Sequence, residues 1–138
     1  MSDNRATIEC DEFLAHPPAV VWRAITDPEL QAQWWAPGDV RPVVGHRFTI
    51  TLKPWGELPC VVLAVEPERM IRYSLGGGST DSTITWRLVP EGGGTRLLLT
   101  QEGFDLDSPL AKAAYDRLNH GWPIVLERME PVLREVAA

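Results

Sequence analysis

The chain has 138 residues, of which 44% are hydrophobic and 23% charged, and its formal net charge is −6. This length and composition are typical of one globular domain, and we interpret residues 1–138 as a single domain. An acidic chain without a run of Lys or Arg is a poor partner for nucleic acid, and no apolar run is long enough for membrane insertion. The first five residues lack the apolar core of a signal peptide, so we expect a cytoplasmic location.

The N-terminal part predicts one strand and two short helices. Residues 6–14 alternate as a strand, but the inward face stays open, so Glu9 and Asp11 are either a solvated pair or face the interior. Pro17-Pro18 suits a helix start, because proline is tolerated at the first helical position. Asp27 followed by Pro28 predicts a second N-cap and a short helix to about Trp34.

Trp34 and Trp35 stand where this second helix is predicted to end. Two adjacent side chains cannot face the same side of a helix or strand. One ring is therefore expected in the core and the other against a loop or a cavity wall. We expect Trp34 at a cavity and Trp35 in a structural position. The Pro37-Gly38 pair that follows ends the helix.

The middle of the chain predicts an antiparallel meander. Phe48, Ile50 and Leu52 alternate, and residues 59–66 are apolar throughout. Further alternating runs contain Ile71, Tyr73 and Leu75, then Ile84, Trp86 and Leu88, and finally Leu97, Leu99 and Gln101. Turn residues separate these runs, among them the glycine triplets at 76–78 and 92–94, which we interpret as hairpin turns.

The C-terminal segment predicts a long amphipathic helix that begins at the N-cap Ser108. Its apolar residues recur at steps of three and four: Leu110, Ala114, Leu118, Trp122, Val125, Met129, Leu133 and Val136. Pro123 and Pro131 each remove one helical hydrogen bond. We expect the helix to bend or break near 120–123, and more mildly near 127–131.

Together these elements predict an α+β fold in which a curved antiparallel sheet wraps around the long C-terminal helix. A gap between helix and sheet is then an apolar pocket. Trp86 and Trp122 are expected as its aromatic walls. Gln101 shares a face with Leu97 and Leu99, so its amide pairs either with a ligand or with a neighbour such as Tyr73 or a water. The candidate ligand-binding residues are Trp34, Phe48, Tyr73, Trp86, Gln101, Leu118, Trp122 and Val125.

No pattern of catalytic or metal-binding residues stands out. His16, His46 and His120 are scattered, and Cys10 and Cys60 have no CxxC partner. We expect both cysteines to be reduced and buried. We predict no catalytic residue, no metal and no cofactor.

Motifs along almost the whole chain are those of one family. They are His16-Pro17, Val21-Trp22, Thr26-Asp27-Pro28, Trp34-Trp35-Ala36-Pro37, Gly45-His46-Arg47-Phe48, Val65-Glu66-Pro67, Asp81-Ser82-Thr83-Ile84-Thr85-Trp86, Gly94-Thr95-Arg96-Leu97, Gly103-Phe104 and Gly121-Trp122. On these, the chain resembles the START-like, or SRPBCC, superfamily with its helix-grip fold, and within it the bacterial proteins similar to the activator of heat-shock protein 90 ATPase. The resemblance implies a cytoplasmic protein that binds a hydrophobic ligand or lipid, with a link to the stress response.

The chain departs from the family pattern at positions expected to line the pocket. Gln101 stands where relatives often carry histidine, and Leu75 where a tryptophan is common. Pro123 and Pro131 are unusual in the last helix. The ligand chemistry of relatives therefore does not carry over to this chain.

Three functions stay open. The leading one is binding of a small, largely apolar ligand between the last helix and the sheet. The second is a cyclase-like or dehydratase-like enzyme acting on a polyketide-like substrate, for which Tyr73 and Glu102 are the candidate acid or base groups. The third is a co-chaperone-like interaction module. We also expect that two copies of the chain can form a homodimer.

Overall fold

A computed structural model describes residues 4–138 of the chain. The elements follow the predicted order of one strand, two short helices, five strands and a long helical segment. They are β1 (Arg5–Leu14), α1 (Pro18–Thr26), α2 (Pro28–Trp34), β2 (Arg47–Leu52), β3 (Gly56–Glu66), β4 (Met70–Leu75), β5 (Ser82–Glu91), β6 (Gly94–Asp105), α3 (Pro109–Glu127) and α4 (Met129–Ala137).

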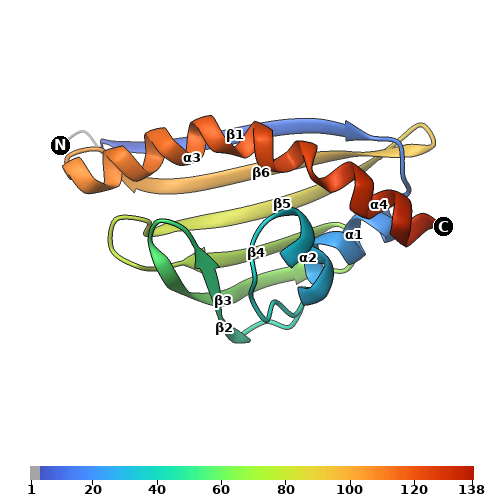
Figure 1. Cartoon of the computed structure of the whole chain (residues 1–138), viewed down its shortest axis with the longest axis horizontal. Helices are drawn as coiled ribbons and strands as arrows, with labels where there is room; N and C mark the ends of the chain where they lie inside the picture. Colours follow the sequence, from blue (N-terminus) through green and yellow to red (C-terminus); the bar gives the residue numbers. More distant parts are fainter. Residues whose placement is uncertain (1–3) are drawn as a thin grey trace.

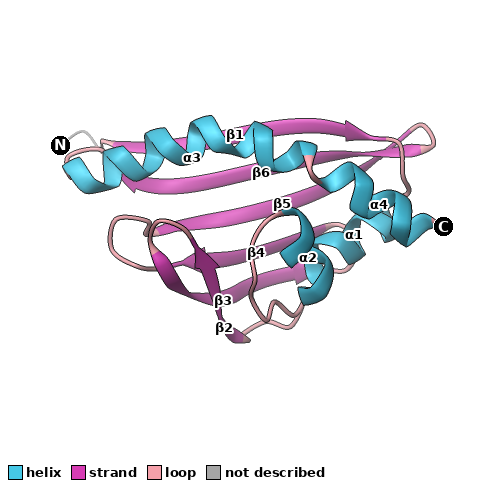
Figure 2. Ribbon diagram, in the orientation of Figure 1, coloured by secondary structure: helices cyan, strands magenta, loops and turns pink. Residues whose placement is uncertain are grey.

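The strands form one sheet with the order β1-β6-β5-β4-β3-β2, in which every neighbouring pair is antiparallel. The meander from β2 to β6 is thus confirmed, and β1 closes the sheet beside β6. Helix α3 runs along β1 and β6, while α1, α2 and α4 gather at the other end of the curved sheet (Figures 1 and 2). This is the predicted α+β helix-grip arrangement, and it leaves α3 opposite the β2–β3 hairpin.

The predicted helix caps are present. The Asp27 carboxylate accepts hydrogen bonds from the backbone N–H groups of Glu29, at 2.9 Å, and Leu30, at 3.4 Å. The Ser108 hydroxyl accepts one from Ala111 at 3.3 Å. Each cap satisfies backbone donors that the first helical turn leaves unpaired, which explains why short polar residues mark these starts.

The inward face of β1, open at the level of sequence, is the one that carries Ile8 and Leu14, which are both buried. Glu9 and Asp11 lie on the exposed face. Asp11 pairs with the guanidinium of Arg96 across the β1–β6 ladder. The two carboxylates are therefore a solvated surface pair and do not face the interior.

The long C-terminal helix is interrupted at Arg128, near Pro131, and not at Pro123. Helix α3 continues through Pro123 and ends at Glu127, and Arg128 separates it from α4. The predicted break near 120–123 is therefore wrong, whereas the interruption expected near 127–131 is present. Asn119, whose carbonyl loses its partner to Pro123, is exposed, so water can satisfy it. Pro131 removes the bond to Glu127, and the backbone N–H of Arg128 instead bonds the carbonyl of Val125 at 3.0 Å.

Helix α4 is held against the segment that precedes α1. The Nε2 atom of His16 lies 2.9 Å from a carboxylate oxygen of Glu130. This hydrogen bond from His16, followed by that from Arg134, holds the pKa of Glu130 below its ordinary value. The interrupted helix thus packs its last turns beside α1, and α3 lies over β1 and β6.

Both cysteines are free thiols, as expected, but only Cys60 is fully buried, since Cys10 is half-buried. Burial raises the pKa of the Cys60 thiol to about 12, which leaves roughly one molecule in 10⁴ as thiolate at about pH 8. We expect iodoacetamide at this pH to modify the half-buried Cys10 in the native protein, at a rate that its raised pKa slows, and Cys60 only after unfolding. Peptide mass spectrometry reads both modifications. Equal native modification of both thiols at pH 8 contradicts the prediction.

Candidate functional site

Four tryptophans form a cluster under α3. The ring centroids of Trp35 and Trp122 lie 5.0 Å apart, and those of Trp34 and Trp86 lie 5.6 Å apart. Trp86 meets Trp122 edge-on at 5.5 Å. These separations are those of favourable aromatic pairs. The cluster therefore joins the end of α2, strand β5 and helix α3 into one rigid aromatic floor.

Hydrogen bonds fix two of these rings at the centre of the fold. The indole N–H of Trp86 donates to the hydroxyl of Tyr73 at 3.0 Å. The indole N–H of Trp122 donates to the Oε1 atom of Gln101 at 2.8 Å. The Nε2 atom of Gln101 in turn donates to the hydroxyl of Ser82 at 3.0 Å. The amide of Gln101 is thus satisfied by protein partners, as one of the two open readings predicted.

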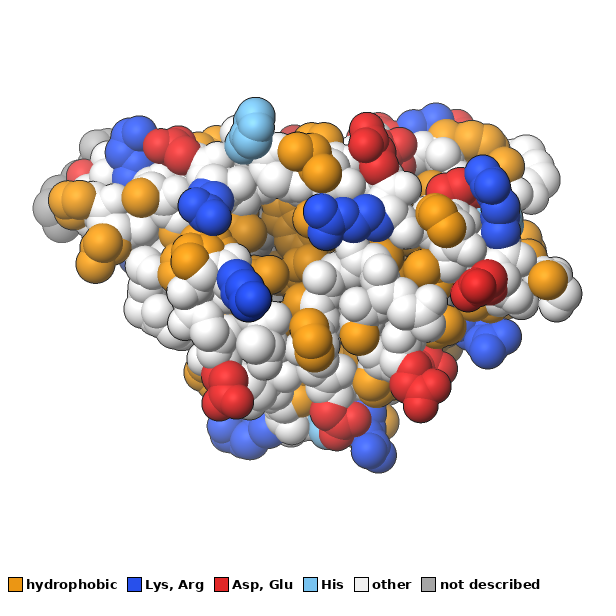
Figure 3. Space-filling view, in the orientation of Figure 1, with side chains coloured by type: hydrophobic (Ala, Val, Ile, Leu, Met, Phe, Trp, Pro, Cys, Tyr) orange, Lys and Arg blue, Asp and Glu red, His pale blue; other side chains and the backbone are white. Residues whose placement is uncertain are grey.

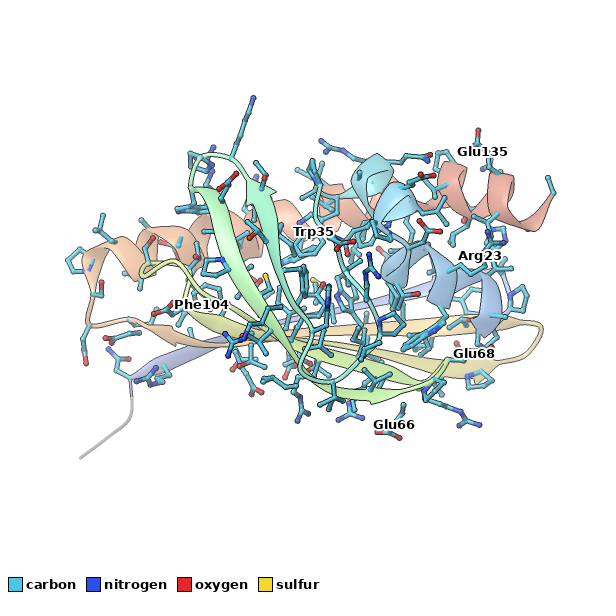
Figure 4. The ribbon with its side chains drawn as sticks, turned by 90° about the horizontal axis from the view of Figure 1, so that it is seen from below. Arg23, Trp35, Glu66, Glu68, Phe104 and Glu135 are labelled. Carbon is cyan, nitrogen blue, oxygen red and sulfur yellow. The ribbon has the colours of Figure 1, made fainter. Side chains whose placement is uncertain are left out.

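An apolar cleft of about 150 Å³ opens beside this cluster, between α3 and the turn that joins β2 to β3. Its lining residues are Trp35, Leu52, Lys53, Trp55, Arg117, Leu118, Gly121, Trp122 and Val125. The space-filling view shows a hollowed hydrophobic surface in this region with Lys and Arg side chains around it (Figure 3). The view from below places Trp35 at the centre of the molecule, between the helices and the β2–β3 hairpin (Figure 4). We refer to this feature as the apolar cleft.

The helical repeat explains which α3 residues reach the cleft. Leu118, Trp122 and Val125 recur at steps of four and three and so share one face of the helix. Gly121 lies on the same side and contributes no side chain. A Cβ atom placed on it meets no atom within 4 Å. The missing side chain at this position keeps the cleft open.

Two cations stand at the mouth of the apolar cleft. Lys53 follows β2, and Arg117 precedes Leu118 on α3; both are exposed. The lining includes no Asp, Glu or His side chain. Within residues 4–138, neither Lys53 nor Arg117 forms an ion pair. The cleft therefore combines apolar walls with a cationic rim, which we call the Lys53–Arg117 rim.

The structure separates the eight predicted site residues into two groups. Leu118, Trp122 and Val125 line the apolar cleft. The other five are buried and line no described cavity: Trp34, Phe48, Tyr73, Trp86 and Gln101. Whether any of the eight contacts a ligand stays a prediction.

The expected placement of the two adjacent tryptophans is reversed. Trp34 is 1% exposed, and its indole N–H donates to the backbone carbonyl of Ala24 at 2.8 Å. This hydrogen bond turns the Trp34 ring toward α1 and the core. Trp35, at the C-cap of α2, lines the cleft. Its indole N–H makes no hydrogen bond within the part of the chain that the structure describes.

Tyr73 is enclosed in the core. Its side chain is fully buried, and burial raises the pKa of its hydroxyl far above the ordinary value. Glu102, the other candidate acid or base, is exposed on β6. None of the family departures at Leu75, Gln101, Pro123 or Pro131 lines the cleft either, which corrects the expectation that these positions surround the pocket.

Sequence reasoning missed most of the cleft. Gly121 was expected, as a small residue, to help shape the gap between helix and sheet. The lining residues that were not assigned to the pocket are Trp35, Leu52, Lys53, Trp55 and Arg117. A usable signal was present in α3, where Arg117, Gly121 and Val125 follow one another at steps of four. No local signal places Lys53 and Trp55 opposite α3, because that depends on how the hairpin curves.

A second, shallower groove of about 290 Å³ continues from the cleft toward the start of α3. It shares Trp55 and Arg117 with the cleft and is also lined by Leu110. Leu110 is 74% exposed, so its predicted place in the packed stripe of the helix is wrong.

Metal binding and membrane crossing are two further possibilities on which the described residues bear. Among residues 4–138, no group of three or more His, Cys, Asp or Glu side chains is arranged to hold a metal ion. Across the same residues, no helix combines the length and the apolar character needed to cross a membrane.

The chain is similar to known proteins both in sequence and in structure. The family described as "Activator of Hsp90 ATPase homolog 1-like protein" matches residues 15–134. No curated protein matches the chain. Protein MLL2253 from Mesorhizobium loti is 36% identical, with a TM-score of 0.83 over 94% of this chain and 98% of that one.

Two further solved structures share the fold at lower identity. Protein BH1534 from Bacillus halodurans is 24% identical, with a TM-score of 0.80 over 94% of this chain and 99% of that one. The Aha1 dimer from Colwellia psychrerythraea is 16% identical, with a TM-score of 0.75 over 93% and 96% of the two chains. The likeness thus extends over nearly the full length of each protein.

Proposed function

The chain belongs to the family of Activator of Hsp90 ATPase homolog 1-like proteins, and on this premise we propose that it binds a small, largely apolar ligand in the apolar cleft. The observation that carries the proposal is the open volume of about 150 Å³ beside Trp35 and Trp122. Its walls are mostly apolar, and concave apolar sites are where small molecules bind.

The size of the cleft sets the expected affinity. A cavity of roughly 150 Å³ accommodates a molecule about as large as benzene. Burying about 150 Å² of ligand surface at about 25 cal/mol per Å² contributes roughly 4 kcal/mol before the cost of association, so the tightest Kd expected is about 1 mM. The rigid aromatic floor lowers the entropic cost of binding, because few side chains need to be ordered.

The test uses octan-1-ol as a neutral apolar probe. We expect it to shift the indole N–H signals of Trp35, Trp55 and Trp122 in ¹⁵N-correlated NMR spectra, with a Kd on the order of 1 mM. Gly121→Leu fills the cleft and is expected to weaken binding at least tenfold. Leucine has a higher helix propensity than glycine, so this variant should fold at least as well.

The matched control is Asn119→Leu, which adds the same side chain on an exposed position of α3 that lines no described cavity. It is expected to bind octan-1-ol as the unmodified protein does. The proposal fails if the unmodified protein shows no saturable shift, or if Gly121→Leu binds unchanged.

The enzymatic and co-chaperone-like alternatives have less support. The ionisable groups at the cleft are Lys53 and Arg117, whereas Tyr73 and Glu102 lie elsewhere. We therefore propose no reaction. The homodimer stays a prediction, since the likeness to the Colwellia Aha1 dimer is one of fold. Native mass spectrometry reads the oligomeric state and any retained ligand in one experiment.

A further inference from the structure

We propose that the apolar cleft selects amphipathic carboxylates, with the alkyl or aryl tail beside Trp35 and Trp122 and the carboxylate at the Lys53–Arg117 rim. This inference rests on the proposed binding function and adds the chemistry of the head group to it. The juxtaposition of an apolar cavity with two cations that have no acidic partner carries it.

The charge of the rim is opposite in sign to the net charge of the chain. The protein has a net charge of −6, yet the cleft lining contributes two cations and no carboxylate. Among the other cations of the chain, Lys112 lies 3.0 Å from Asp116 and Arg134 lies 3.3 Å from Glu130. Within residues 4–138, Lys53 and Arg117 have none. An anionic group on the ligand would therefore complement the positive charge of Lys53 and Arg117.

The position of the two cations suits a head group that stays partly hydrated. Lys53 comes from the turn after β2 and Arg117 from α3, so they approach the mouth from the two elements that bound the cleft. Long basic side chains lay their apolar stems along such walls and keep the charge in water. A carboxylate held there gains charge-assisted hydrogen bonds without the desolvation cost of a buried ion pair.

The volume limits the tail. A space of about 150 Å³ holds a tail comparable to a benzene ring or a medium alkyl chain. Arg117 and Trp55 also line the neighbouring groove, so a longer molecule can continue along α3. Octanoate is therefore a suitable probe, and octan-1-ol has the same chain length with an uncharged head.

The experiment compares these two probes by the indole N–H shifts and by isothermal titration calorimetry. At low ionic strength we expect octanoate to bind about tenfold more tightly than octan-1-ol. At about 1 M NaCl the preference should fall to about twofold, because exposed charges are screened over a few ångströms. This salt titration uses the unmodified protein and so does not depend on any variant.

The variant arm replaces both rim cations, as Lys53→Gln with Arg117→Gln. The octanoate to octan-1-ol preference is expected to fall to about one. The matched control, Lys112→Gln, removes an exposed cation from the same helix that is paired with Asp116 and does not line the cleft. It should keep the tenfold preference.

The outcomes separate the two proposals. If neither probe binds, the apolar-ligand function itself is overturned. If octan-1-ol binds as tightly as octanoate, or if the preference survives both 1 M NaCl and the double replacement, the head-group inference is overturned while apolar binding stands. A preference that disappears equally in Lys112→Gln also overturns it, since net charge then accounts for the effect.

Discussion

Replacement of Trp122 by alanine is expected to lower the free energy of unfolding by about 3–5 kcal/mol. The ring is 2% exposed and packs against Trp35 and Trp86. Its removal leaves a large cavity at the centre of the aromatic floor. It also deprives Gln101 of its buried donor, and an unpaired buried acceptor adds about 1–3 kcal/mol to such a loss.

Urea denaturation of the two proteins measures this difference as a change in midpoint at a similar m value. Trp122→Phe removes the N–H donor and part of the ring volume but keeps one aromatic ring, so its difference from Trp122→Ala reports the packing of that ring. Trp55→Ala, at a half-buried tryptophan of the same cleft, is expected to cost much less. A loss below about 1 kcal/mol for Trp122→Ala contradicts a packed role for this ring.

Replacement of Gly94 by alanine is expected to destabilise the fold by about 1–3 kcal/mol. Gly94 begins β6, where the β5–β6 hairpin passes the end of β1. A Cβ atom there collides with the backbone carbonyl oxygen of Leu14 and comes within 2.7 Å of Cζ of Phe13. A backbone atom cannot move aside as a flexible side chain does, so the strands must separate.

Gly93→Ala is the matched control, one residue earlier in the same hairpin. A Cβ atom at Gly93 meets nothing within 4 Å, and alanine there is expected to change stability by less than about 0.5 kcal/mol. Thermal unfolding followed by circular dichroism compares the two. Equal unfolding midpoints for Gly94→Ala and Gly93→Ala contradict the prediction, because a Cβ atom at Gly94 then causes no loss of stability between β1 and β6.

Much of the fold follows from local chemistry that is visible in the sequence. The caps at Asp27 and Ser108 satisfy backbone donors within two or three residues, so the helix starts need no tertiary information. The alternation of Phe48 and Ile50 likewise determines which side of β2 is buried. Element order and the antiparallel meander were therefore predictable.

The candidate site was predictable only in its α3 part. Leu118, Trp122 and Val125 lie on one helical face, and this apolar face is expected to pack toward the interior of the protein. Residues such as Tyr73 and Gln101 were correctly expected to point inward, but the inside of this protein is mostly packed core. Apolar periodicity distinguishes inside from outside and does not distinguish core from cavity.

The order of the elements, the helix starts and the buried face of β2 follow from the sequence alone, because they depend on contacts and alternation within a few residues. Only the tertiary structure decided that Trp35, and not Trp34, borders the cleft, since the hydrogen bond from Trp34 to Ala24 depends on how α2 packs on α1. It also brought Lys53 and Arg117, 64 residues apart, to one mouth. The two side chains are brought together by the curvature of the sheet around α3, and a local sequence pattern does not predict that curvature.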